Sequence, residues 1–150
     1  NIPLRWRHIA AVCNVLLCAM VREALPDEHA IYVESDLFWA PKTLMDLRDD
    51  LAKVPAVAAM SFRVGSDTFY DIWGHVGLDG VPFSPRRPYH ADLHTELMPI
   101  RSAGSCFALR GDVLPLVQFS PVDGIRGIGA SLRQNGHNLY LDPRLSVYHP

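Results

Sequence analysis

The stretch AIYVESDLFWAPKTL, residues 30–44, decides how this chain folds. It opens with apolar and β-favouring residues that lack a helical period, which predicts a short buried strand. Two carboxylates, Glu34 and Asp36, follow where that strand ends. Pro41 then stands where a helix would begin, and leucines recur behind it at helical spacing, so we predict a helix over 41–53.

The flanking segments extend this pattern to an α/β fold. Upstream, apolar residues at three-and-four spacing predict a helix over 4–25 that Pro26 ends. Its expected buried face consists of Ile9, Val12, Cys13, Leu16, Leu17, Met20 and Ala24. Downstream, PAVAAMSF over 55–62 predicts a buried strand. The order helix, strand, helix, strand favours one domain over residues 1–150, with a mixed, mostly parallel sheet flanked by helices.

The second half of the chain begins with a long irregular segment. From Arg63 to Ile100 the periodicity fails, while glycine, proline and aromatic residues accumulate. A loop of this length in a compact domain is usually functional or mobile. Beyond it we predict a strand in SCFALR, a short helix or turn in GDVLPLVQF, a helix in DGIRGIGASLRQNG ended by Gly136, and one or two strands to the end.

The composition excludes several classes of protein. With 49% hydrophobic residues, 20% charged residues and a net charge of -2, the chain has the composition of an ordinary globular protein. This composition differs from that of disordered proteins and of proteins that coat nucleic acids. The cysteines, Cys13, Cys18 and Cys106, lack metal or disulfide spacing, so we expect them to be buried hydrophobes. The longest uncharged apolar run, over 9–21, is shorter than the ~20 residues that a bilayer requires, so we expect no membrane span.

The paired carboxylates are the first candidate site. On an extended strand Glu34 and Asp36 project to the same face, while Ser35 points away. Two carboxylates on one face suit a hard divalent cation such as Mn²⁺ or Mg²⁺. The alternative is structural: Asp36 or Ser35 caps a local turn, and Glu34 is solvated.

Two residues near the end of the chain can join this pair. His149 follows an alternating strand, and its imidazole would complete a carboxylate site if the two strand ends are neighbours. Alternatively, it is an ordinary surface residue. Asp123 lies at a junction between loop and helix, where it is either a helix N-cap or a carboxylate that faces a cleft and takes a proton from a hydroxyl.

Three stretches, in this order and spacing, resemble the later half of a GT-A type glycosyltransferase: YVESDLFWAPKTLMDL, RSAGSCFALRGDVL, and VDGIRGIGASLRQNGHNLYLDPRLSVYHP. The resemblance is to family 2 enzymes and fungal-type mannosyltransferases. It implies a GT-A fold, an acid-x-acid metal motif in the first stretch, and an acceptor site above the second. Because the opening helix resembles the one that precedes the metal strand, we expect the part that recognises the nucleotide to precede Asn1.

The resemblance also implies roles for single residues. Asp36 would bind the metal directly, His149 would be a further ligand, and Glu34 would contact the metal or the ribose of the donor, with Ser35 beside it. Asp123 falls where inverting members keep the catalytic base. Those members usually show two acids in a row, and this chain has Val122 at the first of them.

Residues 69–77, FYDIWGHVG, resemble the variable segment that shapes the acceptor pocket. Trp73 offers a face for stacking on a sugar, and Asp71 can bind hydroxyls. Gly104 and Ser105 of the second stretch are expected beside the acceptor. The alternative is that Tyr70 and Trp73 pack the loop onto the core.

The implied function is a metal-dependent transfer of a sugar from a nucleotide-sugar donor to a hydroxyl of a carbohydrate or other acceptor, with Mn²⁺ or Mg²⁺ as cofactor and no nucleic-acid partner. The alternatives are a binding or scaffold fragment without catalysis, or a metal-dependent hydrolase of sugar nucleotides.

Overall fold

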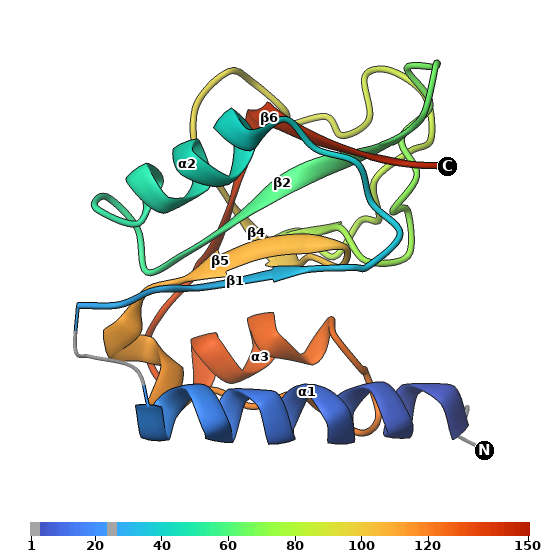
Figure 1. Cartoon of the computed structure of the whole chain (residues 1–150). Helices are drawn as coiled ribbons and strands as arrows, with labels where there is room; N and C mark the ends of the chain where they lie inside the picture. Colours follow the sequence, from blue (N-terminus) through green and yellow to red (C-terminus); the bar gives the residue numbers. More distant parts are fainter. Residues whose placement is uncertain (1–3, 24–26) are drawn as a thin grey trace.

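A six-stranded mixed sheet with helices on both faces forms the body of the chain (Figure 1). The computed structural model describes residues 4–23 and 27–150. The strand order is β1-β5-β2-β6-β4-β3. The strands are β1 (Ala30–Val33), β2 (Ala56–Arg63), β3 (Val76–Gly77), β4 (Met98–Ser102), β5 (Cys106–Leu109) and β6 (Leu139–His149). The helices are α1 (Leu4–Glu23), α2 (Pro41–Asp50), the 3-10 helix η1 (Gly111–Leu116) and α3 (Gly127–Gln134).

The mixed sheet is confirmed, but the expectation of mostly parallel pairing is wrong. Strands β1 and β2 do run in the same direction, yet β5 lies between them and pairs antiparallel with both. Only β2 and β6 pair in parallel among the named strands, since β4 is antiparallel to both β6 and β3. The order helix, strand, helix, strand is correct for the first four elements, but the pattern could not show that a later strand inserts between the first two strands.

Strand β2 is central, and its two faces belong to two hydrophobic cores. Ala58 and Met60 pack in the core beneath α1 and α3, whereas Val57 and Ala59 pack in the core beneath α2. The unbroken apolar run of this strand follows from burial on both sides. Because β2 and β6 are fixed from both faces, the end of β6 is firmly placed relative to the rest of the sheet.

The helix limits differ slightly from those predicted. Helix α2 begins at Pro41 as expected, but it ends at Asp50 and a turn follows. Helix α3 begins only at Gly127, after a turn that includes Gly124. Gly136 has a φ of 79° beyond the end of α3, a left-handed conformation that glycine adopts without strain.

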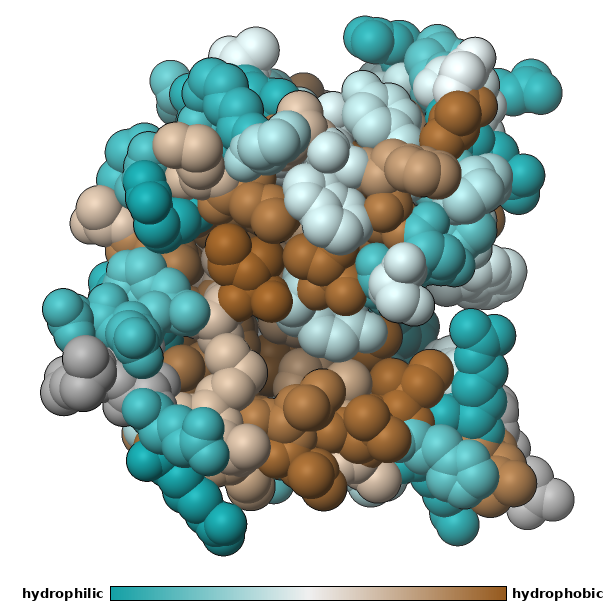
Figure 2. All heavy atoms as spheres, viewed as in Figure 1, coloured by the Kyte–Doolittle hydropathy of each residue, from teal (hydrophilic) through white to brown (hydrophobic). Residues whose placement is uncertain are grey.

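Helix α1 is confirmed, but its expected buried face is wrong in part. Ala10, Cys13 and Leu17 are buried, whereas Val12, Leu16 and Met20 are exposed. The positions predicted for Ala24 and Pro26 lie outside the described residues. Figure 2 shows hydrophobic side chains gathered along α1, below a hollow that separates the helix from the sheet. Cys18 is also exposed, against expectation, while burial raises the pKa of the Cys106 thiol to about 12.

By length and composition alone, the 20 residues of α1 are enough to cross a membrane. The uncharged run over 9–21 therefore underestimates the length of helix that is apolar enough to cross a membrane. A core helix or a signal sequence passes the same test, and the absence of a membrane span stays a prediction.

Helix α3 lies unusually close to β4. A Cβ atom at Gly129 would lie 2.2 Å from the backbone oxygen of Arg101, a distance that side chains do not tolerate. Only glycine therefore lets the helix approach the strand this closely.

The variant Gly129→Ala is expected to lower the free energy of unfolding by about 1–3 kcal/mol, because the added methyl group must push α3 away from β4. Denaturant titration of the variant and the wild type measures this difference. Gln134→Ala, at an exposed position of the same helix, is the control and should change stability by less than about 0.5 kcal/mol. Equal stability of Gly129→Ala and the wild type would show that the helix can shift without cost.

Candidate functional site

The ends of β1 and β6 bring a carboxylate and an imidazole together. Asp36 follows β1 by three residues, and His149 is the last residue of β6. Nε2 of His149 lies 3.0 Å from Oδ2 of Asp36, across 113 positions of sequence. Phe38 joins the two segments nearby, because it exchanges backbone hydrogen bonds with Tyr148. The two strand ends are therefore neighbours, which was the condition for His149 to join a carboxylate site.

The local geometry of the acid-x-acid stretch differs from the expected one. Strand β1 stops at Val33, and Ser35 and Asp36 lie in a turn closed by a hydrogen bond from Leu37 N–H to Glu34 O. The prediction that Glu34 and Asp36 share one face of an extended strand is therefore wrong. Glu34 instead points into a neighbouring cleft, while Asp36 turns toward His149.

The donor set at this point fits a divalent cation. Nδ1 of His149 lies 3.0 Å from the backbone oxygen of Pro150, to which a protonated Nδ1 donates a hydrogen bond. That hydrogen bond holds the ring so that Nε2 faces Asp36, the arrangement that metal-binding histidines commonly have. The ring of Tyr70 stacks on the imidazole at 3.8 Å and fixes its plane. A carboxylate oxygen and an imidazole nitrogen are suitable ligands for Mn²⁺.

Glu34 contributes negative charge beside this pair. Burial raises its pKa above the usual glutamate value, and the negative charges of Asp71 and Asp36 raise it further. Its carboxylate does not belong to a tight cluster with Asp36 and His149. Among the described residues, only Asp79, His90 and Asp92 place three ligand atoms within 4.8 Å of one another.

A cleft of about 270 Å³ collects most of the other predicted site residues. Glu34, Asp71, Trp73, Gly104 and Asp123 all contribute to its lining. The side of the cleft opposite the sheet comes from the start of α1. Trp73 is 77% exposed, so the alternative that it packs the loop onto the core is wrong. Its ring is free to stack on a bound molecule.

Asp71 holds the floor of this cleft together. Its Oδ1 accepts a hydrogen bond from Gly74 N–H at 3.0 Å, and its Oδ2 accepts one from Ser105 N–H at 2.9 Å. The ring of His75, wholly buried, lies 3.1 Å from the same Oδ2. A Cβ atom at Gly104 would lie 2.3 Å from Oδ2, so the glycine leaves room for the carboxylate. Asp71 thus ties its loop to the turn between β4 and β5.

Ser105 acts mainly through its backbone. Its carbonyl oxygen accepts a hydrogen bond from Glu34 N–H at 3.0 Å, and its own N–H donates to Asp71. The residue is only 2% exposed, so the structure gives no support to direct contact with an acceptor. The exposed side chain of Ser35 remains a predicted donor contact.

The variant Asp71→Asn is expected to lower the free energy of unfolding by about 2 kcal/mol at neutral pH, because charge-assisted hydrogen bonds are lost from a partly buried position. Burial alone would raise the pKa of Asp71, but hydrogen bonds from His75 and Ser105 outweigh it and lower the pKa below the usual value. The stabilisation is therefore present above pH ~4 and is lost as the pH falls through the lowered pKa.

Urea denaturation of wild type and Asp71→Asn at pH ~7 and pH ~3 measures this effect, and the difference between the two proteins should shrink at the lower pH. Asp67→Asn, at an exposed carboxylate of the same loop, is the control. A stability difference that does not depend on pH would contradict the ionised role of Asp71.

Asp123 faces the cleft and does not cap α3. The N-cap position of α3 is Arg126, three residues further along, so the N-cap alternative for Asp123 is wrong. The hydroxyl of Ser120 accepts hydrogen bonds from the N–H groups of Val122 and Asp123, and it lies 3.3 Å from Oδ2 of Asp123. The tight turn leaves the carboxylate exposed at the edge of the cleft.

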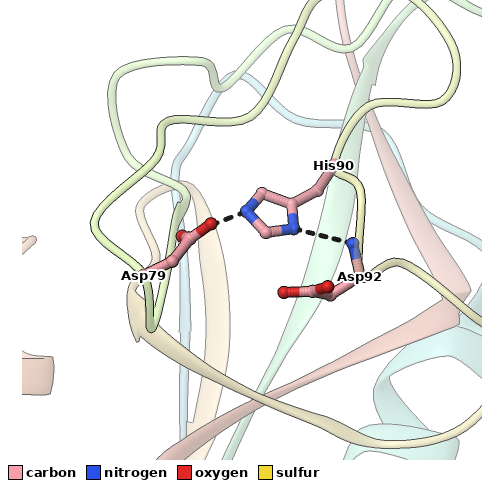
Figure 3. Close-up of side chains that lie close together, drawn as sticks. All are labelled: Asp79, His90 and Asp92. Atoms are coloured by element: carbon pink, nitrogen blue, oxygen red, sulfur yellow. Dashed lines mark hydrogen bonds and ion pairs between the residues drawn. The ribbon is translucent and has the colours of Figure 1, made fainter.

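A separate cluster of possible cation ligands is better explained by hydrogen bonding. Figure 3 shows His90 between Asp79 and the backbone of Asp92. Because Asp92 N–H donates to Nδ1, at 3.2 Å, the ring proton lies on Nε2 and faces Asp79, at 3.3 Å. A cation bound to Nε2 would require the ring proton to move to Nδ1. There it would face the N–H group of Asp92, which already donates to Nδ1. These residues instead brace the long segment between β3 and β4.

Sequence reasoning missed the cleft residues contributed by α1 and by the segment before α3. The guanidinium carbon of Arg126 lies 4.5 Å above the ring of Trp6, and its NH1 donates to the backbone oxygen of Trp73 at 3.2 Å. Asn14 pairs with both backbone groups of Phe119 and fixes the same segment onto α1. None of these contacts follows a local sequence pattern.

No family model and no curated protein matches the sequence. The fold is similar to the crystal structure of GalNAc-T7 with UDP, GalNAc and Mn²⁺, with a TM-score of 0.54 and 19% sequence identity. The similarity covers 89% of this chain and 30% of that chain. At this identity the likeness establishes the fold alone. The chain therefore has the GT-A glycosyltransferase fold, and it spans less than a third of the length of the similar structure.

Proposed function

We propose that this chain is the metal- and acceptor-binding part of a metal-dependent glycosyltransferase, which moves a sugar from a nucleotide-sugar donor to an acceptor hydroxyl. The observation that carries the proposal is the approach of Asp36 to His149 at 3.0 Å, beside a cleft that contains further carboxylates. The similar structure holds UDP, GalNAc and Mn²⁺, which supports the same classes of ligand here.

Asp36 and His149 would hold the cation, either Mn²⁺ or Mg²⁺. When bound, the cation would stabilise the negative charge of the departing diphosphate. Two protein ligands are sufficient, because such ions are commonly completed by substrate phosphates and water. Glu34 and Ser35 lie on the same turn and would contact the donor, with Glu34 toward the ribose or the cation.

The acceptor would lie in the cleft beyond Glu34. Trp73 would stack its exposed ring on a sugar, and the remaining lone pair on Oδ1 of Asp71 would accept a hydrogen bond from a hydroxyl in the cleft. Ser105 would keep Asp71 in position through its N–H. Asp123, exposed at the cleft edge, would take the proton from the attacking hydroxyl in an inverting reaction, or orient the acceptor in a retaining one.

The test is turnover of nucleotide sugars by the complete protein with and without Mn²⁺, in the presence and absence of a carbohydrate acceptor. Calorimetry with UDP accompanies it, since the similar structure holds UDP with Mn²⁺. Mn²⁺-dependent transfer supports the proposal. Absence of metal-dependent nucleotide binding would indicate a scaffold, and loss of donor at the same rate without an acceptor would indicate a hydrolase.

A further inference from the structure

A second cleft, of about 230 Å³, borders the candidate site on the side of α3. Arg101 on β4, Arg126 before α3 and Arg133 on α3 line it, and we call it the arginine cleft. Asp123 and Arg126 line both this cleft and the site cleft. The arginine cleft therefore begins where the proposed proton acceptor lies and extends away from it toward β3 and β4.

The positive charge of the arginine cleft is poorly compensated. NH1 of Arg133 donates to the backbone oxygen of Arg101 at 2.7 Å, and Arg126 likewise donates to a backbone oxygen. Within residues 4–23 and 27–150, the guanidinium of Arg101 has neither a hydrogen-bond acceptor nor a carboxylate partner. Asp123 is the single carboxylate among the described lining residues, against three guanidinium groups.

The guanidinium groups also affect one another. Burial lowers the pKa of Arg133, and the nearby charge of Arg101 lowers it further. Most N–H groups of the three arginines remain available, and a guanidinium matches the oxygens of a carboxylate or phosphate in a two-point hydrogen bond. A bound anion would relieve the repulsion and accept these hydrogen bonds. The chain carries a net charge of -2, so this is a local concentration of positive charge.

We propose that the arginine cleft binds a phosphate or carboxylate group of the acceptor, so that the preferred acceptor is an anionic carbohydrate. This inference rests on the proposed function, because the hydroxyl near Asp123 must belong to the acceptor. From that hydroxyl, a substituent can extend past Asp123 and Arg126 into the arginine cleft, on the side away from Glu34. The donor diphosphate, by contrast, would lie at Asp36 and His149.

The test is a comparison of ligands with the complete protein, without donor or metal. Calorimetry or ligand-observed NMR with glucose, glucose 6-phosphate, glucuronate and inorganic phosphate measures affinity. We expect glucose 6-phosphate and glucuronate to bind at least about tenfold more tightly than glucose, because each gains charge-assisted hydrogen bonds. Equal binding of the neutral and anionic sugars would overturn the proposal. Inorganic phosphate binding as tightly as glucose 6-phosphate would overturn the assignment to the acceptor.

The variant Arg101→Gln should remove most of the preference for the anionic sugars, and Arg101→Lys should restore part of it. Arg86→Gln is the matched control, because it removes the same charge from an exposed position outside the arginine cleft. An unchanged preference in Arg101→Gln, or an equal loss in Arg86→Gln, would contradict a specific site.

A measurement on the wild type needs no variant. Raising the salt from about 50 to about 200 mM should weaken the binding of glucose 6-phosphate and leave glucose unaffected. Salt-independent binding of both would count against the arginine cleft. The two proposals can fail separately. Absence of Mn²⁺-dependent turnover would contradict the proposed function, whereas equal affinity for neutral and anionic sugars would contradict the role of the arginine cleft.

Discussion

Replacing Asp36 by alanine is expected to lower Mn²⁺-dependent transfer by at least about 10²-fold, because a bound metal contributes several kcal/mol to the stabilisation of developing charge. The carboxylate lies 3.0 Å from His149 and is 58% exposed, so it is accessible to a cation and contributes little to the stability of the fold. The expected loss is therefore one of metal binding, with stability almost unchanged.

Calorimetry of UDP binding with Mn²⁺, together with transfer rates over a range of Mn²⁺ concentrations, measures this effect. Asp36→Ala should need much more Mn²⁺ for half-maximal binding. Asp49→Ala is the matched control, since that carboxylate lies on α2 and is similarly exposed, at 62%. Full transfer activity in Asp36→Ala at low Mn²⁺ would contradict the assignment of Asp36 as a metal ligand. A loss of activity in both variants would indicate a general effect of charge.

The secondary structure around Asp36 could be predicted because local signals agree there. The apolar run, the position of Pro41 and the leucine stripe all act within a few residues, and β1 and α2 lie close to their predicted limits. The order of strands depends instead on long-range packing. Nothing in the four residues of β5 shows that it inserts antiparallel between β1 and β2.

The prediction of the buried face of α1 is wrong in part for a related reason. Its apolar residues surround much of the helix, so periodicity could not show which side meets the sheet. Val12 and Leu16 match the helical spacing as well as Cys13 and Leu17 do, yet they remain exposed. A hydrophobic pattern identifies a helix more reliably than it identifies the neighbours of that helix.

The candidate site also contains both contacts that local sequence patterns indicate and contacts that depend on the tertiary structure. The meeting of Asp36 and His149 was implied by the family resemblance, and the strands that precede or contain them, β1 and β6, could be recognised locally. The arginine cleft could not, because its three arginines come from β4, from the turn before α3 and from α3 itself. In the sequence they are single residues among many arginines, and the close approach of α3 to β4 at Gly129 places α3 beside Arg101.

The second large effect is expected at Asp123, where the variant Asp123→Asn should lower kcat by about 10²–10⁴-fold if the residue removes the proton from the acceptor. Asparagine keeps the shape of the side chain and an oxygen for the contact with Ser120, so the turn should persist. Because Asp123 is separate from the Asp36–His149 pair, binding of UDP with Mn²⁺ should remain at the wild-type level.

Transfer rates and UDP calorimetry on the same preparation separate these two effects, and NMR of the product gives the configuration at the anomeric carbon. An inverted product with a large loss in Asp123→Asn supports the role of catalytic base. A retained product with the same loss supports acceptor positioning instead, because a retaining reaction does not require that base. Undiminished kcat in Asp123→Asn would exclude both roles, and loss of UDP binding in step with kcat would show that the turn at Ser120 had collapsed.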